Sequence, residues 1–132
     1  MKDKYCWSRA VEFYETDRAG VVHFSNYYRW MEAAEHAWWQ DVGLAESLQS
    51  SEMDWPRVQA EMKFLGPLRF GDRVEVTLRM KKLGETSLNY HCEIRKNGRY
   101  ELLGEGEMVV VCLQGGKKKG LPEAVRKAFA IS

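Results

Sequence analysis

The sequence is poor in cysteine, and its few cysteines are badly placed for cross-linking. Three cysteines stand far apart among 132 residues, at Cys6, Cys92 and Cys112, and none forms a CxxC pair. An odd number of widely spaced cysteines argues against a disulfide framework and favours a reducing compartment. The three histidines do not fall beside the cysteines in a zinc-ligand spacing, so we expect no metal site.

Long apolar runs and an excess of one charge are also missing. No stretch approaches the roughly 18 apolar residues of a membrane-spanning helix, and the first residues, MKDKYCWSRAVEFYE, lack the apolar core of a signal peptide. Lysine and arginine number 20 against 19 acidic residues, which gives a net charge of +1. The composition therefore offers no argument for nucleic-acid or membrane binding, and we expect a cytoplasmic protein.

What the chain does contain is enough apolar material for one domain. Of its residues, 45% are hydrophobic and 12% are aromatic, with five tryptophans. The aromatic content indicates large buried faces or a subunit interface. No linker or repeat divides the chain, and we expect a single domain over residues 1–132.

A long helix is predicted in the first third of the chain. Ser25 or Asn26 is a suitable N-cap, and Gly43 is a suitable stop after about Val42. Apolar residues between these points recur at steps of three and four, which is typical of a helix with a broad buried face. That face holds Tyr27, Trp30, Met31, Ala34, Ala37, Trp38 and Val42, widened by Tyr28, Ala33 and Trp39. The remaining polar stripe consists of Arg29, Glu32, Glu35, His36 and Gln40.

Most of the remaining sequence alternates apolar and polar residues, as strands do. Lys4–Tyr14 is predicted to be a first strand, and four later runs lie near 58–65, 73–80, 88–95 and 100–113. Asn97-Gly98 predicts a two-residue hairpin turn between the last two runs. Gly104 and Gly106 indicate a bulge or a close backbone approach.

Two short helices complete the predicted order of elements. One is expected at Ala45–Gln49 and the other in LPEAVRKAF, residues 121–129, where a proline occupies the first turn. The run GGKKKG at 115–120 between strands and helix is typical of a solvated loop. Together the elements predict an α+β fold in which a curved antiparallel sheet surrounds one long buried helix.

The stretch YETDRAGVVHFSNYYRW, residues 14–30, carries the candidate chemistry. Asp17 stands ahead of the helix start, and Gly20 permits a positive φ or a tight backbone approach where the chain turns back. The amides near His23, Phe24 and Ser25 then lie unpaired at the positive end of the helix dipole, where they suit a developing oxyanion. An acid held nearby can attack an acyl carbonyl or activate a water. The alternative is that Asp17 only caps a turn and Gly20 only makes one.

This stretch resembles the active-site signature of the 4-hydroxybenzoyl-CoA thioesterase-like family, in the hotdog-fold superfamily. The matching frame is a Thr-Asp pair, a glycine three residues after the aspartate, two β-branched residues, an aromatic-or-histidine pair, and Asn-Tyr opening a helix. FLGPLRFGDRVEVTLRMKKLGETSLNYHCEI, residues 64–94, is similar to the strand hairpins of the family, so the resemblance covers nearly the whole chain.

The resemblance implies a hotdog fold, a dimer or larger assembly, and hydrolysis of acyl-CoA thioesters. The catalytic carboxylate of the family corresponds to Asp17, as nucleophile or general base, and its oxyanion donor to the backbone amide of Phe24. In many members the polar ring follows the aromatic one, whereas here His23 comes first. A backbone donor survives that exchange, but a side-chain role for a polar residue at position 24 does not. Further pocket residues implied by the match are Gly20, Val21, Val22, His23, Asn26 and Tyr27.

Several other polar residues are candidates for binding. Coenzyme A carries phosphates, so basic side chains are expected near the pocket mouth. Glu32 and Glu35 stand one turn apart and are expected to be surface or interface charges rather than a catalytic pair. The basic candidates are Lys63, Arg69 and Lys82 in the first place, with Arg79, Lys81 and Lys117–Lys119 also available.

Two functions remain open from the sequence. The first is an acyl-CoA thioesterase that uses Asp17 and needs no metal or redox cofactor, since coenzyme A is part of its substrate. The second is a module that binds acyl-CoA or an acyl-carrier-protein thioester without turnover. In both cases we expect a homodimer or homotetramer, with the site at the subunit boundary.

Overall fold

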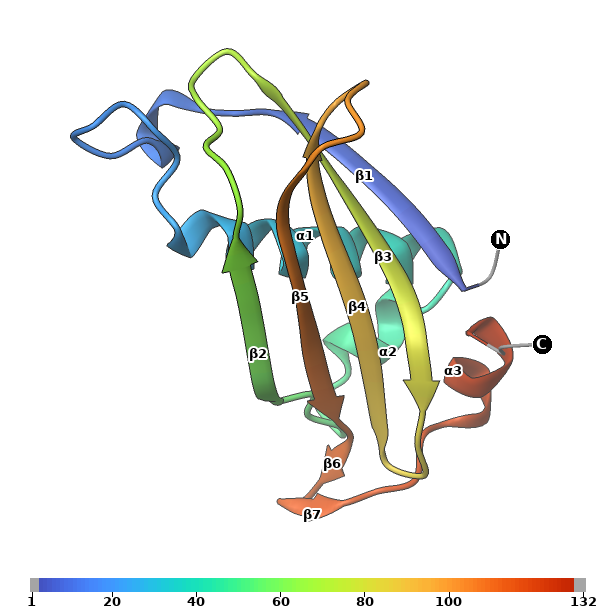
Figure 1. The fold of residues 1–132 in the computed structure, drawn as a ribbon. Helices are drawn as coiled ribbons and strands as arrows, with labels where there is room; N and C mark the ends of the chain where they lie inside the picture. Colours follow the sequence, from blue (N-terminus) through green and yellow to red (C-terminus); the bar gives the residue numbers. More distant parts are fainter. Residues whose placement is uncertain (1–2, 130–132) are drawn as a thin grey trace.

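The computed structural model describes residues 3–129 and contains one five-stranded antiparallel sheet (Figure 1). The strands follow the order β1-β3-β4-β5-β2 across the sheet, so β1 and β2 are its edges. The strands of this sheet are β1 (Lys4–Ala10), β2 (Arg57–Phe64), β3 (Arg73–Leu83), β4 (Ser87–Lys96) and β5 (Leu102–Val111). The other elements are the 3₁₀ turn η1 (Phe13–Glu15), helices α1 (Ser25–Asp41), α2 (Ala45–Gln49) and α3 (Glu123–Ala128), and a small hairpin of β6 (Leu113–Gln114) and β7 (Lys117–Lys118).

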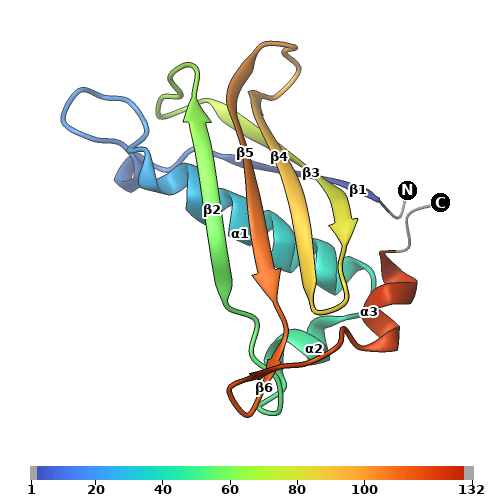
Figure 2. The ribbon, with the colours of Figure 1, turned by 60° about the horizontal axis from the view of Figure 1, so that its bottom comes forward.

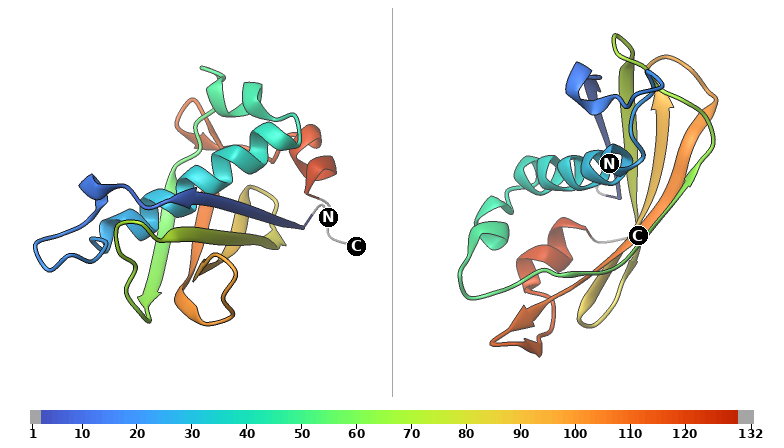
Figure 3. Two further views of the ribbon diagram at one scale, coloured as in Figure 1. Left: turned by 90° about the horizontal axis from the view of Figure 1, so that it is seen from above. Right: turned by 90° about the vertical axis from the view of Figure 1, so that its left-hand side faces the viewer.

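The core lies between α1 and one face of the sheet (Figure 3). Three tryptophans of α1, Trp30, Trp38 and Trp39, are at most 1% exposed. Strand β4 alternates fully buried and half-buried residues, which places one of its faces in the core. The predicted mixture of helix and antiparallel sheet is therefore confirmed. Within residues 3–129, no helix is long and apolar enough to cross a membrane.

Strand β2 lies at one edge of the sheet (Figure 2), and two of its apolar side chains are exposed. Val58 is 59% exposed and Phe64 is 45% exposed. An edge strand also presents unpaired backbone N–H and C=O groups along its open side. β2 is therefore the part of the sheet that most invites pairing with another chain.

The first strand ends earlier than predicted. β1 pairs with β3 only as far as Ala10, which lies opposite Arg73, the first residue of β3. After Ala10 the chain has no partner strand. It forms the 3₁₀ turn η1 where the sequence predicted that the strand would continue to Tyr14. The prediction was wrong there because alternation in sequence does not reveal where a partner strand begins.

The Asn97-Gly98 turn is also longer than predicted. Gly98 has the positive φ of such a turn, +80°. The first pair of strand residues, however, is Arg95 with Leu102, next to a register shift after Ile94. The loop therefore spans residues 97–101, and the two-residue hairpin was wrong.

Helix α1 has nearly the predicted bounds but not the predicted cap or polar stripe. Its N-cap is Phe24, one residue before Ser25 and two before Asn26, and it ends at Asp41, two residues before Gly43, which has φ +83°. Glu35, assigned to the polar stripe, is fully buried at 0% exposure. The stripe prediction was wrong at this position because β2 and β4 cover that side of the helix and supply partners for a carboxylate.

Candidate active site

A tight hairpin of chain, residues 15–23, joins η1 to α1 and carries Asp17. Its two limbs pair like antiparallel strands: the His23 N–H donates to the Glu15 carbonyl at 2.9 Å, and the Asp17 N–H donates to the Val21 carbonyl at 2.7 Å. Gly20 closes the turn with φ +82°, a conformation that L side chains rarely adopt, which confirms the prediction of a positive φ. The hairpin therefore fixes the backbone on both sides of the aspartate.

The Asp17 side chain is exposed and caps its own turn. Its Oδ1 accepts hydrogen bonds from the N–H groups of Ala19 at 2.9 Å and Val21 at 3.3 Å. Its Oδ2 forms no hydrogen bond with any residue that the structure describes. One oxygen thus does what the turn-capping interpretation expects, while the other remains available for chemistry.

The start of α1 has one backbone amide without a protein partner. The Ser25 N–H donates to Nδ1 of His23 at 3.2 Å, and the Asn26 N–H donates to the His23 carbonyl at 2.9 Å. The Phe24 N–H, just before these two, makes no hydrogen bond within the described part of the chain. A free amide at a helix N-terminus lies at the positive end of the dipole and suits an oxyanion.

The His23 ring packs locally. Its Nδ1 lies 2.8 Å from the Ser25 hydroxyl, and the ring stands 4.6 Å from the Phe24 ring, centroid to centroid. These contacts hold the first turn of α1. The expected place of His23 in a substrate pocket stays a prediction.

Glu15 is a buried residue beside the candidate site that the sequence pattern does not indicate. It is only 4% exposed, and its carboxylate accepts the Glu12 N–H and the Trp30 Nε1–H, each at 2.8 Å, and pairs with Arg9. Its carbonyl also accepts the side-chain N–H of Asn26 at 2.9 Å. In the sequence, Glu15 is one of several acidic residues in the same segment. Nothing in that pattern indicates that this one is buried.

An open apolar groove of about 300 Å³ lies beside the start of α1. The rings of Phe24 and Phe64 meet edge to face in it, 5.8 Å apart, and the Tyr27 hydroxyl donates to the Gly66 carbonyl at 2.8 Å. Burial raises the pKa of Tyr27, so this hydroxyl stays protonated as a donor. The groove is lined by Val21, Val22, Phe24, Tyr27, Phe64, Leu65, Gly66 and Pro67.

The structure brings the predicted pocket residues together in three ways. Some line the groove, some build the hairpin, and Asn26 uses its side-chain amide to hold the hairpin against α1. Whether each contacts substrate stays a prediction. The groove residues are Val21, Val22, Phe24 and Tyr27, and the hairpin residues are Gly20 and His23.

Of the three basic candidates for the coenzyme A phosphates, only Arg69 lies beside the Asp17 hairpin. Its backbone bridges to Val21, and its Nη1 lies 3.9 Å from the place of a Cβ on Gly20. Lys82 lies near the end of β3, at the far end of the sheet from the hairpin (Figure 1). Lys63 alternates with the groove residue Phe64 along β2 and therefore points to the opposite face of the sheet.

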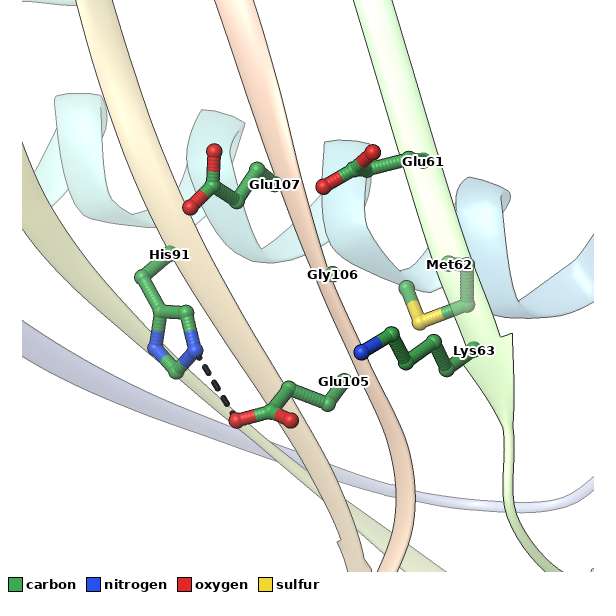
Figure 4. Close-up of a pocket in the computed structure, with 7 residues that line it drawn as sticks. All are labelled: Glu61, Met62, Lys63, His91, Glu105, Gly106 and Glu107. Carbon is green, nitrogen blue, oxygen red and sulfur yellow. Dashed lines mark hydrogen bonds and ion pairs between the residues drawn. The ribbon is translucent and has the colours of Figure 1, made fainter.

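Figure 4 shows the surroundings of Lys63, a polar depression of about 420 Å³ on the outer face of the sheet. Three carboxylates, of Glu61, Glu105 and Glu107, line it together with His91, whose Nε2 lies 3.2 Å from an oxygen of Glu105. So many acids around one lysine disfavour phosphate binding. Across residues 3–129, no group of three or more His, Cys, Asp or Glu side chains forms a candidate metal site.

A second buried glutamate lies in the middle of α1. Glu35 forms an ion pair with Arg57 of β2, whose Nε lies 3.3 Å from Glu32. Oε2 of Glu35 has no hydrogen-bond partner among the described residues. Burial raises the pKa of Glu35 to about 7, against the opposite effect of Arg57.

Comparison with known proteins places this geometry in a family. The thioesterase-like superfamily matches residues 11–129. A 1,4-dihydroxy-2-naphthoyl-CoA hydrolase of Prochlorococcus marinus (strain NATL2A) is 32% identical over an alignment of 106 residues. The match covers 70% of this chain and 66% of that enzyme, just under two thirds of its length.

Solved structures agree with the sequence matches. A gentisyl-coenzyme A thioesterase is 31% identical with a TM-score of 0.84, covering 96% of this chain and 99% of that one. A 1,4-dihydroxy-2-naphthoyl-CoA thioesterase from Synechocystis is 25% identical with a TM-score of 0.90, covering 96% and 95%. The predicted resemblance to hotdog-fold thioesterases is confirmed, and these relatives are enzymes of the predicted class. The chain belongs to the thioesterase-like superfamily.

Proposed function

We propose that the chain is an acyl-CoA thioesterase that acts as one hotdog domain over residues 1–132. The observation that carries the proposal is the Asp17 hairpin next to the unpartnered Phe24 amide, at the edge of an apolar groove. An exposed carboxylate oxygen, an oxyanion donor and an apolar wall are the three parts that thioester hydrolysis needs. The family of the chain supports the same reaction.

The reaction follows from these groups. In the nucleophile route, Oδ2 of Asp17 attacks the thioester carbon, the Phe24 N–H stabilises the oxyanion, and the coenzyme A thiolate leaves. Water then hydrolyses the acyl-aspartyl anhydride and restores the carboxylate. In the general-base route, Asp17 takes a proton from the water that attacks the carbon directly; the C–S bond breaks, and the departing coenzyme A thiolate takes up that proton. Both routes consume one water and release the free acid and coenzyme A, and neither route requires a metal or a redox cofactor.

A small hydroxylated aryl thioester is the substrate class that we propose. The relatives named above act on 1,4-dihydroxy-2-naphthoyl-CoA and gentisyl-CoA, both of which carry a hydroxylated ring. The aromatic rings of Phe24, Tyr27 and Phe64 offer flat faces and edges for such a ring. Arg69, beside the hairpin, is the candidate for a coenzyme A phosphate.

The proposed active unit is a homodimer or homotetramer. The exposed edge of β2 provides a pairing surface, and the groove beside Phe64 stays open on the same side of the molecule. Pairing of two sheets through β2 would extend the curved sheet around the α1 helices and close the groove at the subunit boundary.

The binding module without turnover remains the second candidate. The observation in its favour is the Oδ1 atom of Asp17, which is engaged by two amides of its own turn. Such an arrangement also occurs where an aspartate has only a structural task.

A thiol-release assay separates the two candidates. Purified full-length chain is offered benzoyl-, dihydroxybenzoyl- and dihydroxynaphthoyl-CoA and short acyl-CoAs, and free thiol is measured with a chromogenic dye. We expect the aryl thioesters to react fastest and Asp17→Asn to lower kcat at least about 10²-fold. Asp41→Asn, an exposed aspartate at the other end of α1, is the matched control and should keep full activity.

Coenzyme A protection against heating completes the assay. Both candidates predict that coenzyme A or a thioester raises the melting temperature of the chain and of Asp17→Asn. Protection without any thiol release above the Asp17→Asn background would favour the binding module and reject the enzyme.

A further inference from the structure

Glu15 joins four separate pieces of the chain at one buried point. Its carboxylate accepts hydrogen bonds from η1, through the Glu12 N–H, and from α1, through the Trp30 Nε1–H. It also pairs with Arg9 at the end of β1. Its carbonyl accepts the His23 N–H from the far limb of the hairpin. The side chain thus ties sheet and helix together, while the backbone of the same residue closes the hairpin.

The Glu15 carbonyl also decides which amide at the helix start is free. It takes the His23 N–H, and the side-chain N–H of Asn26 donates to the same oxygen. The Ser25 N–H is taken by the His23 ring. Within residues 3–129, the Phe24 N–H, between the amides of His23 and Ser25, is the one that has no hydrogen-bond partner. A shift of the Glu15 carbonyl would release the His23 amide and change the path of the chain into α1.

We propose that Glu15 is a positioning residue that fixes the distance between the Asp17 carboxylate and the Phe24 amide. The inference rests on the proposed thioesterase function, because it concerns the same site. Glu15 does not contact substrate. It acts through the hairpin, whose base it locks to α1 through Trp30 and Asn26.

The requirement is for an acceptor with two oxygens. Three donors converge on the Glu15 carboxylate, which belongs to a residue that is only 4% exposed. The Trp30 donor is buried as well, so water cannot easily replace the carboxylate there. Glu15→Gln keeps the shape but turns one acceptor into a donor, which must then face Arg9, the Trp30 N–H or the Glu12 N–H. The substitution therefore loosens the hairpin base without removing volume.

The test compares Glu15→Gln with Glu35→Gln in the full-length chain. Both substitutions replace a buried, arginine-paired glutamate, but Glu15 adjoins the hairpin whereas Glu35 lies in the middle of α1. Steady-state kinetics are measured on the best aryl-CoA, and amide hydrogen exchange is followed by mass spectrometry in peptides covering residues 16–24. The melting temperature of each variant is measured first, and all other measurements are made well below it.

For Glu15→Gln we expect a fall in kcat of about 10²-fold with KM changed less than about threefold, because a misplacement of about 1 Å has an effect of that size on the chemical step. Exchange should speed up in residues 16–24 and stay unchanged in peptides from β4. Glu35→Gln should keep both kcat and the exchange pattern. Equal losses of kcat in the two variants, or a full kcat for Glu15→Gln, would overturn the proposal.

Asn26→Ala supplies a second variant if Glu15→Gln does not fold. It removes the side-chain hydrogen bond to the Glu15 carbonyl but leaves the buried carboxylate intact. We expect kcat to fall about 10-fold, with faster exchange in the same peptides. Should the parent chain release no thiol from any substrate, the proposed function fails, and the exchange result alone then decides whether Glu15 holds the hairpin.

Discussion

Glu15 and Glu35 are two buried glutamates with different surroundings: Glu15 contacts α1 from the hairpin, whereas Glu35 belongs to α1 itself. Both pair with an arginine, Arg9 for the first and Arg57 for the second. Both oxygens of Glu15 accept hydrogen bonds, whereas Oε2 of Glu35 has no partner among the described residues. Burial raises the pKa of Glu35 to about 7, so this carboxyl changes charge close to neutral pH.

The difference shows that burial alone does not define the role of a carboxylate. A fully satisfied carboxylate acts as a fixed joint, because each of its acceptor sites holds a separate piece of chain. A partly satisfied one is stable in the protonated form and responds to pH. The first kind suits a catalytic loop, and the second makes the contact between α1 and β2 sensitive to pH.

The largest expected effect is a pH dependence of stability that belongs to Glu35. Its pKa is raised from an ordinary 4.5 to about 7, so the folded chain binds more protons than the unfolded chain between these values. Its stabilising effect is present below pH 4.5 and is lost as the pH rises through 7, about 3 kcal/mol in all. The groups that face it are Arg57, Glu32, His36 and Tyr90.

Urea denaturation of the parent chain and of Glu35→Gln, at pH 5 to 8.5, measures this effect. The difference in free energy of unfolding between the two should change in favour of the glutamine variant as the pH rises. Parallel curves for the two proteins would show that Glu35 does not titrate in this range.

A smaller loss of stability is expected from Glu15→Gln. The free energy of unfolding at pH 7 should fall by about 2 kcal/mol, because a donor replaces an acceptor that faces the Trp30 N–H and Arg9. Glu35→Gln at the same pH should lose less than about 1 kcal/mol, since glutamine resembles the protonated acid. Chemical denaturation of both variants measures these two losses of stability. A larger loss for Glu35→Gln than for Glu15→Gln would contradict the comparison of the two glutamates.

The smallest of the three effects concerns Tyr90, beneath Glu35. The Trp39 Nε1–H donates to its hydroxyl at 2.7 Å, and both side chains are fully buried. Tyr90→Phe leaves this N–H unsatisfied and should lower the free energy of unfolding by about 1 kcal/mol. Because the phenol also faces Glu35, the pH dependence of the variant should shift as well. A change in neither quantity would separate Tyr90 from the cluster.

The sequence predicted the long helix and the place of the hairpin well, because both depend on local signals. The 3.6-residue period and Gly43 determine α1, and a glycine three residues after Asp17 determines the turn. The close approach predicted at Gly106 is confirmed, since a Cβ there would lie 2.0 Å from the Glu61 carbonyl oxygen.

What the sequence could not show depends on contacts between distant segments. Arg57 stands 22 residues after Glu35, and nothing in the helical pattern marks that pair. The role of Glu15 depends in the same way on Arg9, η1 and α1 meeting at one point. The groove itself needs the β2–β3 loop, whose path is set by packing rather than by periodicity.

Gly104 has a consequence for the width of the groove, although it does not line it. A Cβ at this position would lie 3.0 Å from Cδ2 of Tyr27, so the ring rests directly on the bare backbone of β5. Any larger residue would lift the ring and, through its hydroxyl, the Gly66 carbonyl to which it is bonded. In the proposed thioesterase, the bulk of the acyl group would therefore be limited from beneath, by a residue outside the groove lining.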